Sequence, residues 1–236
     1  MPFRDTYWNI PHWASWLLYI MQALALAVLL GRLYLRISLW LKGNGSLPVD
    51  RFWKRLGRVW RYALAQTRIA RERYAGIMHL SMFLAFVVLF IGTLLATIDY
   101  DIWVLILDAK LLQGNFYLAY ELVLDFFTVA GVFGLALALI RRATTRPEEL
   151  TYGFGFAAML WLLLVDLLSG LVLESFRLAA VRPPWETWSF AGYAVSRIWV
   201  GLGIGPASLR TVHLVMWLFH AGVTALIYVV FLDLPL

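Results

Sequence analysis

Five long apolar segments, separated by polar connections, dominate the pattern of the chain. They cover roughly residues 13–37, 75–98, 116–140, 152–174 and 208–234. Each is long enough to supply the ~20 apolar residues that a helix needs to cross a bilayer. None shows the strict alternation of apolar and polar positions that is typical of a membrane β-barrel strand. The pattern therefore predicts an all-α, polytopic bundle of five transmembrane helices, forming one domain over residues 1–236.

Composition and charge agree with a membrane protein and indicate its orientation. Of the 236 residues, 62% are hydrophobic, and the net charge is +6. Lys and Arg concentrate in the connection 38–74 and in RRATTRP after the third apolar segment. Because cytoplasmic loops carry such an excess, we expect both loops in the cytoplasm, the N-terminus outside and the C-terminus cytoplasmic. The basic excess thus indicates topology rather than nucleic-acid binding.

The basic connection also contains a predicted amphipathic helix. In DRFWKRLGRVWRYALAQTRIARERY, basic and aromatic residues alternate at helical spacing, and Asp50 after Pro48 is the expected N-cap. This helix is either a docking surface for an acidic cytoplasmic partner or a segment lying on anionic lipid. The outer connection 175–207 holds Trp185, Trp188 and Trp199, whose spacing suits an interfacial helix over the outer mouth of the bundle, or an aromatic belt alone.

The four histidines are the first candidates for chemistry, because no cysteine is present to bind zinc or an iron–sulfur cluster. His12, His79, His213 and His220 all fall in or at the edge of predicted membrane helices. One such histidine alone would be read as a helix-packing residue. Four together indicate axial ligands of a heme iron held between facing helices.

Helical spacing limits how these histidines can pair. His213 and His220 are seven residues apart, so they share a face about 10.5 Å apart along the axis. We expect one of them to ligate a heme and the other to bond a propionate, a quinone oxygen or the bundle. His79 lies near the inner boundary, so it must reach toward His220 by helix tilt or bind nothing, whereas His12 shares the outer leaflet with His213.

Intramembrane carboxylates are the second group of candidates. Asp125, Asp166, Glu121 and Glu174 lie in the predicted helices, where carboxylates pair, face a cavity or carry protons. Glu174 and Arg177 are three residues apart and can meet on one helical face. They form either a propionate anchor or proton shuttle beside a quinone, or an interfacial ion pair.

Two further pairs have simpler interpretations. Asp99 and Asp101 close the second predicted helix, where solvation is an adequate explanation for them. Gly131 and Gly134 allow close approach of another helix, the commoner use of such glycines, or of a porphyrin face.

The segments RERYAGIMHLSMFLAFVVLFIGT, GNFYLAYELVLDFFTVAGVFGLALALIRR, SGLVLESFRLA and HLVMWLFH resemble a known family. They are similar to the membrane domain of iron–sulfur oxidoreductases related to heterodisulfide reductase, including the electron-transfer-flavoprotein:menaquinone type. More distantly they resemble the gamma subunit of respiratory nitrate reductase. The resemblance covers nearly all of the chain.

The resemblance implies a b-type cytochrome subunit of the cytoplasmic (inner) membrane. It would relay electrons between a cytoplasmic iron–sulfur partner and a quinone, menaquinone in this family, through one or two hemes b. His79, His213 and His220 correspond to histidines of the family's second and fifth helices. We expect the quinone in the outer half, near Asp166 and the Glu174–Arg177 pair.

Two departures from the family pattern qualify this expectation. Fused members continue into a further histidine and a cysteine-rich domain, whereas this sequence ends at Leu236, so a separate subunit or a longer chain would supply them. Nitrate reductase gamma subunits carry a second histidine where Leu89 stands here, so an outer heme would need another ligand, such as His12. The rival function is a heme-free membrane anchor for a soluble redox enzyme. A transporter is disfavoured by the odd helix count and the missing repeats.

Overall fold

The computed structural model confirms the all-α membrane fold. It describes residues 1–43, 50–148, 150 and 152–231. Five helices in this part of the chain are long and apolar enough to cross a membrane. They are α1 (His12–Leu41), α3 (Arg73–Ile98, continued by the π-helical turn η3, Asp99–Val104), α4 (Gly114–Thr144), α5 (Phe154–Val181) and α7 (Pro206–Phe231). The protein is therefore a multi-pass membrane protein.

Short helices occupy the two long connections. After α1 come α2 (Phe52–Arg58), the π-helical turn η1 (Val59–Leu64) and the 3₁₀ turn η2 (Ile69–Arg71). Between α5 and α7 lie η4 (Glu186–Trp188) and α6 (Phe190–Gly201). Helix α5 runs past the predicted boundary at 174, so Arg177 lies inside a helix rather than in the loop predicted over 175–207. The predicted end of the last helix, 232–234, lies outside the described residues.

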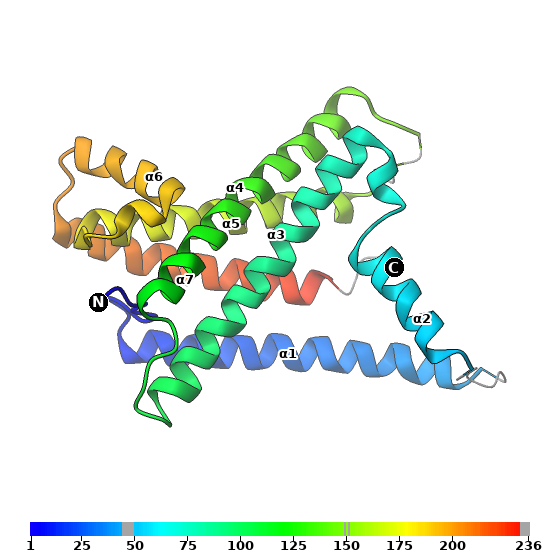
Figure 1. The fold of residues 1–236 in the computed structure, drawn as a ribbon, viewed down its shortest axis with the longest axis horizontal. Coiled ribbons are helices and arrows are strands. Elements are labelled where there is room, and N and C mark those ends of the chain that lie inside the picture. The colour runs from blue at the N-terminus through cyan, green and yellow to red at the C-terminus, as the bar shows by residue number, and fades with distance from the viewer. Residues whose placement is uncertain (44–49, 149, 151, 232–236) are drawn as a thin grey trace.

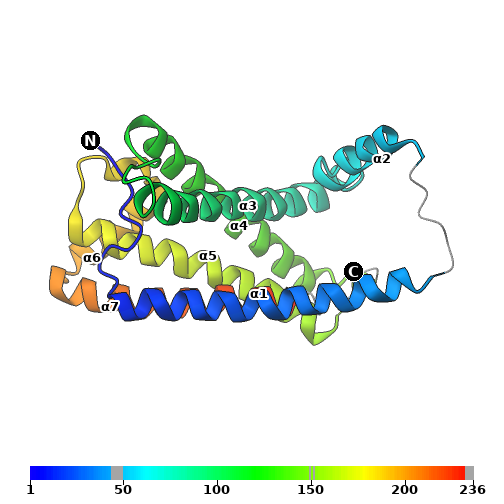
Figure 2. The ribbon, with the colours of Figure 1, turned by 90° about the horizontal axis from the view of Figure 1, so that it is seen from below.

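The five long helices form two groups joined by contacts between α4 and α5 (Figures 1 and 2). Helices α3 and α4 pack as one hairpin, whereas α7 packs between α5 and α1. In Figure 1 the hairpin runs obliquely to α1 and α7, and α6 and the N-terminus lie at the end of the bundle opposite α2. We call these the α6 end and the α2 end. Helix α6 packs on α5 and α4 and covers the α6 end.

Glycines set the close approach of α3, α4 and α5. A β-carbon on Gly131 would lie 2.8 Å from Cβ of Ala85 and 2.7 Å from Cδ1 of Leu167. One on Gly134 would lie 2.8 Å from the backbone oxygen of Met78. Both glycines thus allow close helix packing, and Gly131 also borders the cavity described below.

The basic connection differs from its prediction. Asp50 is not the N-cap of a helix: α2 begins at Phe52, and its N-cap is Arg51 in the left-handed region, without a side-chain cap. The Asp50 carboxylate instead accepts a hydrogen bond from the Arg55 guanidinium at 3.1 Å, which draws it away from the backbone N–H groups. The segment also breaks into α2, η1 and η2 instead of forming one helix.

Solvation does not explain Asp99, so this prediction was wrong. Asp99 is fully buried, and its Oδ1 accepts hydrogen bonds from the backbone N–H groups of Leu111 (2.7 Å) and Leu112 (2.8 Å). A buried carboxylate needs such donors, and here they fasten the connection after η3 to the start of α4. Asp101 accepts a hydrogen bond from the Tyr19 hydroxyl at 2.5 Å and so joins η3 to α1.

Candidate functional site

His220 is held in a defined orientation by two residues of α5. Its Nδ1 lies 3.0 Å from Oγ of Ser169 and 3.5 Å from Oδ1 of Asp166. The single hydroxyl proton of Ser169 is donated to the backbone oxygen of Asp166 at 3.0 Å. Since that proton is used, Nδ1–H of His220 is the donor to Ser169. This tautomer leaves the Nε2 lone pair of His220 available for a ligand.

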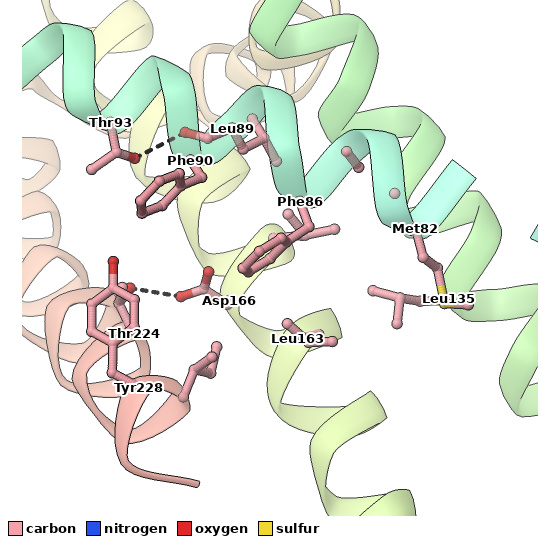
Figure 3. Close-up of a pocket in the computed structure, with 14 residues that line it drawn as sticks. Met82, Phe86, Leu89, Phe90, Thr93, Leu135, Leu163, Asp166, Thr224 and Tyr228 are labelled. Atoms are coloured by element: carbon pink, nitrogen blue, oxygen red, sulfur yellow. Dashed lines mark hydrogen bonds between the residues drawn. The ribbon is translucent and has the colours of Figure 1, made fainter. Parts of the chain in front are cut away.

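A cavity of about 110 Å³ lies one helical turn along α7 from His220 (Figure 3). Thr224 of α7 and Asp166 of α5 border it on one side, where Thr224 donates a hydrogen bond to Asp166 at 2.8 Å. Phe86, Leu89 and other apolar residues of α3 border it opposite, as Figure 3 shows. The cavity thus lies between α3 and the α5–α7 pair, with an apolar lining and few polar groups, as binding sites commonly have.

His79 lies on the face of α3 that borders this cavity. It is three residues before Met82 and seven before Phe86, both lining residues, and such spacings share one helical face. His79 is partly exposed, and its ring stacks on that of Phe83 with 6.2 Å between the ring centroids. His79 and His220 are therefore not themselves lining residues, but each lies about one helical turn from one, Met82 on α3 and Thr224 on α7.

The hydrogen bonding of His220 has the chemistry of a heme ligand. An axial histidine usually donates its second ring N–H to a carboxylate, hydroxyl or backbone oxygen, which is the arrangement of His220 with Ser169 and Asp166. Gly170 leaves room for the ring, since a β-carbon there would lie 3.2 Å from Cε1 of His220. Within the described residues no three His, Asp or Glu side chains gather to hold a bare metal ion. A heme, held by single histidines from facing helices, needs no such cluster.

His213 lies at the α6 end in a different environment. Only 5% of this residue is exposed, and its Nδ1 has no hydrogen-bond partner in the described part of the chain. The ring of Trp8 packs edge-on against the His213 ring, with 4.8 Å between the ring centroids. His12 is exposed at the first position of α1, and it is Trp8 that contacts His213.

A buried polar cluster, missed in part from the sequence, occupies the α6 end beside α6 itself. The predicted contact of Glu174 with Arg177 is present: Nη2 of Arg177 lies 3.2 Å from Oε1 of Glu174, and it also lies 3.5 Å from Oε2 of Glu121. Arg4 of the N-terminal segment pairs with Glu121 at 3.8 Å. Ser189, just before α6, hydrogen-bonds both carboxylates. Arg4 and Ser189 lie outside the helices that carry Glu121 and Glu174, so no helical spacing rule signals them.

Asp125 holds the start of α6. Its carboxylate accepts hydrogen bonds from the backbone N–H groups of Ala191 and Gly192, the latter at 3.4 Å. Free N–H groups at a helix start favour a negative charge. Asp125 therefore fastens α6 to α4.

The N-terminal segment closes the α6 end from the other side. Asn9 donates a hydrogen bond to the backbone oxygen of Arg210 at 2.7 Å, and Arg4 N–H donates to the oxygen of Leu112 at 3.0 Å. The Tyr7 hydroxyl donates to Tyr19 at 3.1 Å. Burial raises the pKa of Tyr7, which keeps this donor protonated.

Comparison with known proteins finds one clear similarity. The chain is 27% identical, over 242 aligned residues, to the EtfAB:quinone oxidoreductase of Syntrophomonas wolfei subsp. wolfei. The alignment covers 96% of this chain but 32% of that protein, so the chain spans about a third of the length of its relative. No protein-family model matches the chain, and no solved structure matches it. The similarity is weak but extends over nearly the full chain, and it relates the protein to a quinone oxidoreductase.

Proposed function

We propose that the protein is a b-type cytochrome membrane subunit that relays electrons between a cytoplasmic iron–sulfur partner and a membrane quinone, menaquinone. The similarity to an EtfAB:quinone oxidoreductase over almost the whole chain supports the quinone-linked role. The observation that carries the heme assignment is His220, whose Nδ1 is engaged by Ser169 and Asp166 beside an apolar cavity.

In this proposal His220 would hold heme b, and His79 is the candidate for a second residue that would hold it. A bound heme supplies one-electron transfer. Ser169 and Asp166 keep the His220 ring in one tautomer and one orientation. Phe86 and Leu89 line the cavity with apolar surface and exclude water from it.

The quinone is assigned to the α6 end rather than to the cavity. Asp166 and Glu174 are eight residues apart, about 12 Å along α5, so one quinone ring does not contact both. Asp166 is occupied by His220 and Thr224, which makes it a positioning residue. His213 offers a buried ring nitrogen without a partner, suited to a quinone oxygen, and the Glu174–Arg177 pair supplies charge nearby.

The α2 end is assigned to the cytoplasm, in the inner membrane. Its connection carries Lys54, Arg58 and Arg61, and basic loops are retained on that side. An acidic surface of the iron–sulfur partner would dock on this basic segment.

The proposal is tested by following heme oxidation in the purified protein. After reduction with dithionite and removal of excess reductant, a water-soluble menaquinone analogue should reoxidise the heme. Replacing Glu174 by Gln or His213 by Ala should slow this reoxidation while leaving the heme absorbance in place. His12→Ala should change neither the reoxidation rate nor the heme absorbance. Reoxidation unaltered in both variants would contradict the quinone assignment. Protein without heme would leave the rival function, a heme-free membrane anchor.

A further inference from the structure

Two carboxylates from different helices meet on one hydroxyl at the α6 end. Oγ of Ser189 lies 3.1 Å from Oε1 of Glu174 on α5, and it also hydrogen-bonds Oε2 of Glu121 on α4. Glu121 and Ser189 are both buried. The same Nη2 of Arg177 reaches the same two carboxylate oxygens.

The number of protons available decides which hydrogen bonds Ser189 can form with the two glutamates. A serine hydroxyl has one proton and can donate to one carboxylate only, while an ionised carboxylate can only accept. Ser189 therefore hydrogen-bonds both oxygens only when one of the two glutamates is protonated and donates to Oγ. Two ionised carboxylates sharing one site also repel each other, which favours protonation of one of them.

The charges around the two glutamates also favour one bound proton. Arg4 from the N-terminal segment and Arg177 from α5 carry two positive charges, whereas Glu121, Glu174 and Asp125 carry three negative ones when all are ionised. Asp125 is committed to the backbone N–H groups of α6. One bound proton makes the cluster neutral, which lowers the cost of burying Glu121 and Asp125 and of partly burying Glu174.

Other titratable groups around the pair complete the environment. Tyr117, one turn before Glu121 on α4, is fully buried, and its hydroxyl has no hydrogen-bond partner among the described residues. The ring of Tyr120, also on α4, lies under the Arg4 guanidinium, with 5.3 Å between Cζ of Arg4 and the ring centroid. On α7, His213 is buried within reach of the positive charge of Arg177. The Tyr117 hydroxyl lies beside Glu121 and Arg177 and can donate or accept, so it is placed to pass a proton to or from the cluster, directly or through a buried water.

We propose that Glu121, Ser189 and Glu174 form a buried proton-binding site that holds one exchangeable proton between the two carboxylates. Binding forms one O–H bond on a carboxylate oxygen and needs no other reactant. The site rests on the contacts above and requires no heme. Its use as a proton store for quinone chemistry, in which reduction takes up protons and oxidation releases them, rests on the proposed function.

Infrared spectroscopy of the purified full chain tests the site directly. A protonated carboxylic acid gives a C=O stretching band that shifts in D₂O, and Glu→Gln removes it. We would record wild type, Glu174→Gln and Glu121→Gln at neutral pH, with Glu186→Gln as the matched control. Glu186 lies three residues before Ser189. Its backbone oxygen accepts a hydrogen bond from the Ser189 N–H at 3.3 Å, which Gln retains, and no contact of its carboxylate with the cluster is found among the described residues. Size-exclusion profiles and thermal unfolding would establish that each variant is folded.

A shared proton has a distinctive signature in this experiment. Either glutamate replacement should abolish the same band, because the remaining carboxylate is then stabilised in its ionised form by Arg177. Glu186→Gln should leave the band unchanged. If Glu121→Gln does not fold, Glu174→Gln and Ser189→Ala still test the proposal. Glu174→Gln should abolish the band, and Ser189→Ala should shift or remove it because it removes the bridging hydroxyl. A band absent from wild type, or one that survives Glu174→Gln, would overturn the proposal, whether or not the protein binds heme or reacts with quinone.

Discussion

Gly170 on α5 faces the imidazole of His220 so closely that a β-carbon on Gly170 would lie 3.2 Å from Cε1 of the ring. A glycine at this position lets the Cε1 edge of the ring approach α5 closely, where Ser169 reaches Nδ1. The orientation of the candidate heme ligand therefore depends on a residue that has no side chain.

Replacing Gly170 by Ala should displace the His220 ring by a few tenths of an ångström and weaken its bond to Ser169. Loss of a group that orients a metal ligand typically lowers affinity by about 10–100-fold, and we expect the lower part of that range. Heme titration of the purified apoprotein measures it. Gly222→Ala is the control, because no atom lies within 4 Å of a β-carbon there. Equal heme affinity in the two variants would contradict the packing argument.

Asp125→Ala should loosen α6 from the bundle. It removes a carboxylate that accepts two backbone hydrogen bonds at the start of α6, and such charge-assisted bonds are worth about 1.5–3 kcal/mol each. We expect a lower unfolding temperature in detergent and faster proteolysis between residues 182 and 205. Thr187→Ala, an exposed change in the same connection, is the control. Proteolysis at the wild-type rate would show that α6 is held by other contacts.

Gly131→Ala should destabilise the packing of α4 against α3 and α5. Its β-carbon would collide with Ala85 and Leu167, and such overpacking costs about 1–3 kcal/mol. Thermal unfolding in detergent should show a clear decrease. Gly31→Ala in α1 meets no atom within 4 Å and should be neutral or slightly stabilising, since alanine favours helix. Equal unfolding temperatures for the two variants would argue against close packing at Gly131.

The membrane orientation can be tested with single cysteines, because the chain has none of its own. We expect Lys54→Cys, at the basic α2 end, to react with a membrane-impermeant thiol reagent only when the reagent reaches the cytoplasmic side. Thr187→Cys, at the α6 end, should react from outside in intact cells. Labelling with the opposite pattern would reverse the assignment of the two ends. It would also move the expected partner surface to the α6 end.

The sequence predicted the helices well because length and hydrophobicity are sufficient to define a membrane span. It also predicted the Glu174–Arg177 contact, since residues three apart on a helix are neighbours. It missed the partners that tertiary packing supplies. Nothing in the spacing indicated that Asp166 and His220, which are 54 residues apart, would meet, or that Ser189 would join two glutamates.

The errors have the same origin. Asp50 has the residue type of an N-cap and Asp99 the position of a solvated helix end, and local pattern treats both as independent of the rest of the chain. Arg55 draws the first away from the backbone, while the N–H groups of Leu111 and Leu112 bury the second. Where a polar side chain finds a partner outside its own helix, sequence spacing gives no warning.

The most direct test of the cytochrome proposal is a dithionite-reduced minus oxidised difference spectrum of the purified protein, with a pyridine hemochrome assay for heme per chain. We predict an α-band typical of heme b, lost in His220→Ala, weakened or lost in His79→Ala and retained in His12→Ala. Near one heme per chain would indicate the single pocket at His220, and near two would require an outer ligand such as His12. Folded protein without an α-band would contradict the account.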